Sequence, residues 1–117
     1  MDLRALAAAQ AEFDRQHGWS TDSPEPEALI AGLQKDIVGL VAEVGEFANI
    51  VQKIERNRVI SPDPRSEISS HHSALAEELA DGFVYLLRLA NRLGVDLEAE
   101  YMGKLAKNEE RFAKFMQ

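Results

Sequence analysis

A chain of 117 residues is long enough to bury a hydrophobic core, and we expect one domain over residues 1–117. It contains no cysteine, which excludes disulfides, thiolate metal sites and a cysteine nucleophile. Its formal net charge of −7 argues against DNA or RNA as a partner, because binding to a phosphate backbone needs clustered Lys and Arg. The N-terminal sequence MDLRALAAAQAEF carries charges and no long apolar run, so we expect no signal peptide, no membrane span and a cytoplasmic location.

The first half of the chain has the apolar spacing of two helices. Residues 2–17 contain regularly spaced apolar residues and no β-branched residue, which favours a helix. Gly18 follows as a residue that can end this helix in a left-handed conformation. Residues 27–56 carry apolar side chains at helical spacing from Ile30 to Ile54, and they predict a second, long helix.

The second half predicts two more helices after an interruption. Residues 57–72 hold two prolines and many small polar residues, so we expect a mobile loop there. A third helix is predicted to start near Ser73 and to stop at Gly94. Asp96 is suited to cap a fourth helix, which we expect to run to about Phe115.

These helices predict an all-α fold, a four-helix bundle in which the second and third helices are the long central pair. From Leu75 to Leu93 the third helix reads LAEELADGFVYLLRLANRL, and its apolar residues spread over more than half of its circumference. One four-helix layer cannot cover so wide an apolar face. We therefore expect a homodimer or homotetramer that forms through the apolar face of the third helix.

Glu78 lies inside the apolar arc of this third helix, between the directions of Tyr85 and Leu89. Removing water from an ionised carboxylate is costly unless the charge is paired or bound to a metal. The nearest basic residues, Arg88 and Arg92, are predicted to point to the opposite, polar side. Glu78 then pairs with another helix or lies beside a bound cation, unless the helix edge is shifted and leaves Glu78 in solvent.

Two pairs of acids stand on the long predicted helices, each pair on one face. Glu43 and Glu46 on the second helix are three residues apart, as are Glu78 and Asp81 on the third. If the apolar stripes of these helices pack on each other, the four carboxylates meet. Like charges at such distances cannot all ionise without cations, and hard oxygen ligands without soft donors select Mg²⁺ or Mn²⁺.

A basic and amide stripe lies on the predicted fourth helix, where Lys104, Asn108 and Arg111 share one face. Opposite a metal cluster, this stripe would neutralise a polyphosphate; alternatively, it is an ordinary solvated stripe near a helix C-terminus. Lys53, two turns after Glu46, is either within reach of a phosphate or a surface lysine.

In this order and placement, the motifs resemble the MazG-like, all-α nucleoside triphosphate pyrophosphohydrolases, a family that includes dCTP and dimeric dUTP pyrophosphatases. The resemblance is carried by ExxE on one helix, ExxD on the next and K-x3-N-x2-R on the last. It runs from about Ala9 to Phe112 and covers the segments AEFDRQHGW, LVAEVGEFANIVQK and EELADGFVYLLRLANRLGVDLEAEYMGKLAKNEERF.

The resemblance implies a Mg²⁺-dependent hydrolase that cleaves the α–β phosphoanhydride bond of a nucleoside triphosphate, releases the monophosphate and pyrophosphate, and removes surplus nucleotides. It implies that the metal-binding acids are Glu43, Glu46, Glu78 and Asp81. It implies that the triphosphate is held by Lys104, Asn108 and Arg111, and that the nucleotide site is lined by Tyr85. Trp19 and Gln10 match positions of a base and sugar pocket, although a tryptophan at a helix–loop junction also fills cores. We expect Glu43 or Glu46 to orient the attacking water.

Two other kinds of protein fit parts of this pattern. A helical oligomerisation or nucleotide-sensing module of the same fold would lack turnover and could dispense with the acids, which are all present here. A di-iron bundle protein would need a Glu-x-x-His ligand pair, which the second and third predicted helices lack. The acids favour the hydrolase.

Overall fold

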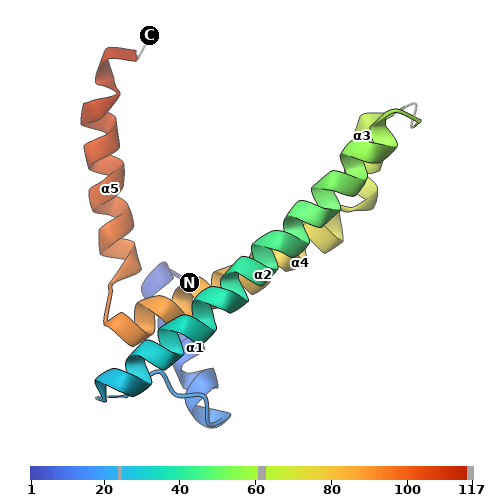
Figure 1. The fold of residues 1–117 in the computed structure, drawn as a ribbon. Coiled ribbons are helices and arrows are strands. Elements are labelled where there is room, and N and C mark those ends of the chain that lie inside the picture. The colour runs from blue at the N-terminus through green and yellow to red at the C-terminus, as the bar shows by residue number, and fades with distance from the viewer. Residues whose placement is uncertain (24, 61–62, 116–117) are drawn as a thin grey trace. The chain divides into compact units, whose positions relative to one another are not determined.

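The structure, a computed structural model, describes residues 1–23, 25–60 and 63–115. Its elements are α1 (Leu3–Gln16), α2 (Pro26–Arg58), α3 (Pro64–Ser70), α4 (His72–Leu93), α5 (Leu97–Arg111) and the 3₁₀ turn η1 (Ala113–Phe115), as Figure 1 shows. The described part of the chain contains no strand, so the predicted all-α class is confirmed. None of its helices is both long enough and apolar enough to span a bilayer.

The helices divide into two compact units. One unit joins Met1–Leu29 to Leu87–Gln117, and the other is Ile30–Leu86. The residues of α4 are thus shared, with its last turns belonging to the first unit.

Helix ends in the first unit follow the predicted capping. The side chain of Asp96 accepts the Ala99 N–H at 3.1 Å, which makes Asp96 the N-cap of α5 as predicted. Gly18 and Gly94 have φ angles of 75° and 65°, so each supplies the left-handed residue after its helix. The last predicted helix is shorter than expected, because α5 ends at Arg111 and a 3₁₀ turn follows.

Polar side chains tie α1 to its neighbours within the first unit. Arg4 forms ion pairs with Asp96 at 2.9 Å and Glu98 at 2.7 Å, at the start of α5. Asn91 on α4 donates to the Ala7 carbonyl oxygen on α1 at 3.0 Å. Two apolar residues on this same part of α4, Leu87 and Ala90, are buried.

In the second unit, α2 and the first part of α4 lie side by side (Figure 1). Gly39 allows a close approach, because a Cβ on it would lie 2.9 Å from Cδ1 of Tyr85 and nearer still to Cε1 and Cζ. Gly82 is buried, and a Cβ added to it would lie 3.7 Å from Cδ1 of Leu40. The two long helices therefore pack as predicted, with glycines at their contacts.

Residues 57–72 differ from the sequence prediction, because α2 continues to Arg58 and α3 forms over Pro64–Ser70. The prediction of a loop is therefore wrong over the helical residues, whereas residues 59–60 and 63 are non-helical as predicted, and residues 61–62 lie outside the described part of the chain. Helix α3 forms for a local reason. Asp63 caps α3 through the Arg65 N–H at 3.1 Å, and Pro64 occupies the first helical turn, where a missing N–H costs nothing. Asn57 donates to Glu67 at 2.7 Å and ties α3 to α2. The mobility of this segment stays a prediction.

Candidate metal and nucleotide site

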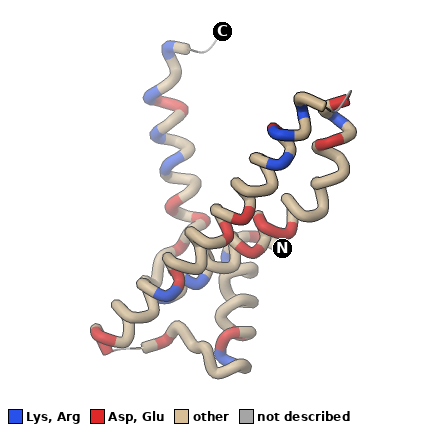
Figure 2. The backbone as a smooth tube through the Cα atoms, turned by 45° about the vertical axis from the view of Figure 1, so that its right-hand side comes forward, with Lys and Arg blue, Asp and Glu red and all other residues tan. Residues whose placement is uncertain are grey.

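Three carboxylates from the two long helices converge in the second unit. Glu43 and Glu46 on α2 and Glu78 on α4 each offer an oxygen, and these oxygens all lie within 4.8 Å of one another. Figure 2 shows acidic segments of α2 and α4 next to each other partway along the helix pair. The packing of α2 on α4 thus brings together three of the four predicted acids.

The carboxylates of Glu43 and Glu78 each keep one oxygen away from both water and protein donors. Atom Oε2 of each is buried and has no hydrogen-bond partner among the described residues. Burying an ionised carboxylate oxygen without a donor or cation is strongly unfavourable. The donor set therefore fits a hard divalent cation, since it consists of carboxylate oxygens alone.

The electrostatics of Glu78 agree with this geometry. The pKa of Glu78 is raised from 4.5 to about 7. The largest cause is hydrogen bonding of its protonated form to Glu43 and to Glu46, and smaller contributions come from burial and from the negative charges of Glu46 and Glu43. In the metal-free protein, a proton on Glu78 relieves the repulsion within the cluster. A bound cation would relieve the same repulsion with all three groups ionised.

Asp81 does not join this cluster in the described structure. It is exposed on α4, one turn after Glu78. A residue at i+3 on a helix is rotated about 60° from the first, which is enough to move a short side chain out of a narrow site. The role of Asp81 as a fourth ligand stays a prediction.

An apolar groove of about 340 Å³ adjoins the cluster between α2 and α4. Glu43 and Glu78 line it together with apolar side chains, among them Phe47, Leu79 and Phe83. Tyr85, predicted to line a nucleotide site, is half-buried on α4 and packs against Gly39 of α2. The acids thus sit at the edge of an apolar surface, as their position in the sequence predicts.

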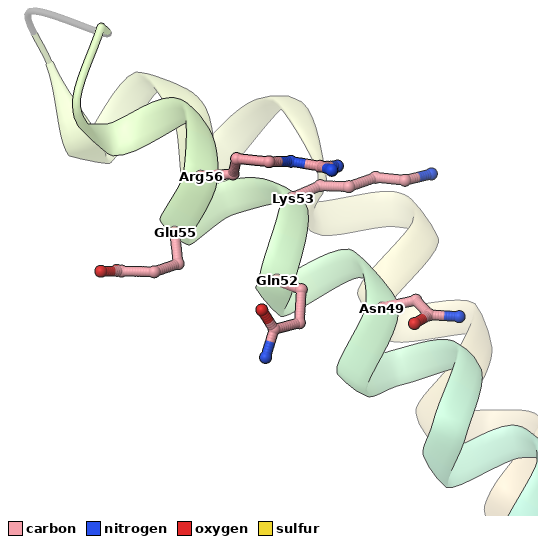
Figure 3. A pocket seen from close by; sticks show the side chains of 5 residues that line it. All are labelled: Asn49, Gln52, Lys53, Glu55 and Arg56. Carbon is pink, nitrogen blue, oxygen red and sulfur yellow. The ribbon is translucent and has the colours of Figure 1, made fainter.

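Further along α2, Lys53 lines a second hollow of about 420 Å³, with Asn49, Gln52, Glu55 and Arg56. In Figure 3, Lys53 and Arg56 point to the same side of α2, whereas Glu55 points away from them. Lys53 is exposed, so the structure leaves both predicted readings of this residue open.

The predicted phosphate-binding stripe lies on α5, in the first unit. Lys104 and Arg111 are exposed, and Asn108 is half-buried. The guanidinium of Arg111 lies 4.9 Å from the ring centroid of Phe112. All three stripe residues fall within one continuous helix, so they share a face as predicted.

Trp19 and Gln10 lie in the first unit as well. The indole of Trp19 is 52% exposed, so it does not fill the core. It stacks on His17 with a centroid distance of 5.2 Å, and His17 stacks on Phe13 at 4.2 Å. Gln10 donates to Oδ1 of Asp14 at 3.0 Å.

Comparison with known proteins gives a consistent family. No protein-family model matches the chain. The proteins named dCTP pyrophosphatase 1 from Rattus norvegicus and Homo sapiens are each 32% identical to it over 111 residues, which is 95% of this chain. Gene 37 protein of Mycobacterium phage L5 is 37% identical over 84 residues, 70% of this chain and 68% of that protein. The chain belongs to the MazG-like family. It spans 57% of the length of the dCTP pyrophosphatases that it matches.

One polar pair in this MazG-like chain was missed by the sequence analysis. Arg88, predicted to point to the polar side of its helix, is only 7% exposed and forms an ion pair with the buried Asp14 at 2.8 Å. The available signal was the position of Arg88 inside the apolar run Leu86, Leu87, Leu89 and Ala90. An arginine in such a run indicates a buried partner on another helix.

Proposed function

We propose that this MazG-like chain is a Mg²⁺-dependent hydrolase that cleaves nucleoside triphosphates between the α and β phosphates. The observation that carries the proposal is the convergence of Glu43, Glu46 and Glu78 with two buried, unpartnered carboxylate oxygens. The similarity to dCTP pyrophosphatases supports it and makes dCTP the first substrate to test.

The three clustered acids would hold Mg²⁺ or Mn²⁺, with Asp81 as the predicted fourth ligand. When bound, such an ion supplies Lewis-acid polarisation of phosphoryl oxygens and lowers the pKa of a bound water. Glu43 or Glu46 would accept a hydrogen bond from the attacking water and orient it toward the α-phosphorus. Glu78, whose pKa is raised to about 7 in the metal-free protein, would complete the site only when ionised.

The remaining residues would bind the nucleotide. Lys104, Asn108 and Arg111 would neutralise the triphosphate and the departing pyrophosphate through charge-assisted hydrogen bonds. Lys53, whose side chain extends beside that of Arg56, would contribute a further cation. Trp19 offers an exposed aromatic surface on which a base can stack. Gln10 and Tyr85 are the further residues that we propose to contact the nucleotide.

The apolar surface of the helix pair supports self-association. Leu79 and Leu86 on α4 and Val41 and Val44 on α2 are between 43% and 64% exposed. We propose that these side chains meet those of a second copy to give a homodimer or homotetramer, with the four-helix bundle predicted from the sequence as the fold of each subunit. Light scattering of the purified protein measures the molar mass of the oligomer directly, and a monomer at all concentrations would contradict the proposal. We also propose a cytoplasmic location. The net charge of −7 supports the further proposal that the protein has no nucleic-acid partner.

The reaction is tested by a turnover panel. Purified protein is incubated with each common dNTP and NTP, with and without Mg²⁺, and the monophosphate, diphosphate, phosphate and pyrophosphate products are resolved. We expect metal-dependent release of monophosphate and pyrophosphate. Release of diphosphate and free phosphate would show that another bond is cleaved and would contradict the proposal.

The acidic cluster is tested with a matched pair of variants on α4. Glu78→Gln removes one clustered charge, whereas Glu77→Gln removes an exposed charge one residue away. We expect Glu78→Gln to abolish turnover with an unchanged helical circular dichroism spectrum, and Glu77→Gln to retain turnover. Metal-induced stabilisation without turnover of any nucleotide would favour the nucleotide-sensing module instead.

A further inference from the structure

Asp14 and Arg88 form a buried ion pair between α1 and α4 in the first unit. Asp14 is 1% exposed, and its Oδ1 accepts from Arg88 at 2.8 Å and from Gln10 at 3.0 Å. Its Oδ2 is buried without a partner among the described residues. Buried ion pairs of this kind add little stability over apolar residues of similar volume, and in some proteins they instead specify one conformation.

Both backbone groups of Trp19 are attached to this pair of residues. The Trp19 N–H donates to the main-chain oxygen of Asp14 at 2.7 Å. The Trp19 carbonyl oxygen accepts a long hydrogen bond of 3.5 Å from Arg88. Gly18, with a φ of 75°, reverses the chain so that Trp19 returns to the end of α1. The carboxylate of Asp14 is thus paired with Arg88, and Arg88 in turn contacts the backbone of Trp19.

The indole itself is held from one side and open to solvent over half its surface. His17 stacks on it with an interplanar angle of 25°, and the His17 ring is hydrogen-bonded to the Phe13 carbonyl oxygen at 2.7 Å. Fixing the backbone of the half-exposed Trp19 limits the directions that its side chain can take in its allowed rotamers. The contacts to Asp14 and Arg88 supply that restraint.

We propose that Asp14 and Arg88 are positioning residues that hold Trp19 as a preset stacking surface for the nucleobase. This inference rests on the proposed nucleotide function. A rigid aromatic surface binds more tightly because less conformational freedom is lost on binding, and the restraint on one side chain corresponds to about a two- to tenfold change in affinity. The pair does not touch the reacting phosphates, so its loss should raise KM and leave kcat unchanged.

Trp19 is the single tryptophan of the chain, so intrinsic fluorescence reports on it alone. The test variant is Asp14→Leu/Arg88→Met, which removes both charges and leaves neither one buried without its partner. Arg88→Lys is a second variant, which keeps the charge but replaces the guanidinium, whose Nη1 contacts both Asp14 Oδ1 and the Trp19 carbonyl oxygen. Arg4→Met is the matched control, because it breaks an ion pair between α1 and α5 without touching Trp19.

We expect the double variant to retain its helical circular dichroism signal, with greater acrylamide quenching and lower anisotropy of Trp19. Its KM for dCTP should rise about two- to tenfold at constant kcat, with a smaller rise for Arg88→Lys and none for Arg4→Met. Unchanged quenching, or an unchanged KM beside altered quenching, would overturn the positioning role. Absence of turnover in the wild type would instead refute the proposed function, because the quenching measurement needs no nucleotide.

Discussion

The packing of α2 on α4 is open to a direct test at Gly39. The change is Gly39→Ala, which adds one methyl group where Cδ1 of Tyr85 would lie 2.9 Å away and two further ring atoms nearer still. Ordinary van der Waals contact begins at about 3.5 Å, so the ring or the helix must move. The matched control is Gly45→Ala on the same helix, where nothing lies within 4 Å of the added atom.

The expected magnitude follows from two opposing effects. Both substitutions gain about 1 kcal/mol of helix propensity, because glycine is unfavourable in a helix interior. Gly39→Ala also loses about 1–3 kcal/mol through overpacking. The free energies of unfolding of the two variants should therefore differ by about 1–3 kcal/mol, which corresponds to roughly 4–12 °C in Tm for a domain of this size.

The assay is thermal and urea unfolding followed by circular dichroism at equal protein concentrations. We expect Gly45→Ala to unfold above the wild type and Gly39→Ala to unfold below Gly45→Ala. A double-mutant cycle with Tyr85→Ala should recover the difference, because removal of the ring removes the clash. Equal midpoints for Gly39→Ala and Gly45→Ala would refute the close approach of Tyr85 to α2.

Three further predictions concern single residues. Glu78 binds its proton more tightly in the folded state, with a pKa of about 7 against an ordinary 4.5, so its contribution favours folding at low pH and is lost as the pH rises across that interval. Thermal unfolding of metal-free Glu78→Gln from pH 4 to pH 8 should lack this loss, and a pH profile identical to that of the wild type would contradict the shift. Gly94→Ala should lower the free energy of unfolding by about 1–2 kcal/mol because φ is 65° at this position, and Gly94→Asn should lower it less. Equal urea midpoints for these two variants would count against the left-handed cap. Asp63→Ala should destabilise α3 by about 0.5–2 kcal/mol through loss of its cap, measured as faster amide exchange at Arg65, and an unchanged exchange rate there would argue against this helix.

Helix positions were predictable because their signals are local. Apolar spacing located the two long helices, and Gly18, Gly94 and Asp96 marked ends that the structure confirms. The sequence does not predict α3, because prolines usually interrupt helices, whereas Pro64 follows the cap residue Asp63 and starts a helix.

The site was predictable only where helix geometry decides the outcome. The i, i+3 spacing of Glu43 and Glu46 and the apolar surroundings of Glu78 indicated a shared site, and the structure brings these three together. Asp81 has the same spacing from Glu78 but lies outside the cluster. Sequence spacing places it near Glu78, whereas membership of the cluster depends on the direction of its side chain. The apolar run around Arg88 indicates a buried partner, but the choice of Asp14 as that partner depends on tertiary packing between different helices.

Metal binding by the carboxylate cluster is the central claim, and a Mn²⁺ titration followed by electron paramagnetic resonance tests it most directly. The account predicts saturable binding to the wild type and to Glu77→Gln, and loss of that binding in Glu78→Gln with its helical content intact. Mg²⁺ should displace the bound Mn²⁺, because both ions prefer oxygen ligands. Equal Mn²⁺ binding by Glu77→Gln and Glu78→Gln would contradict the claim that this cluster is a metal site.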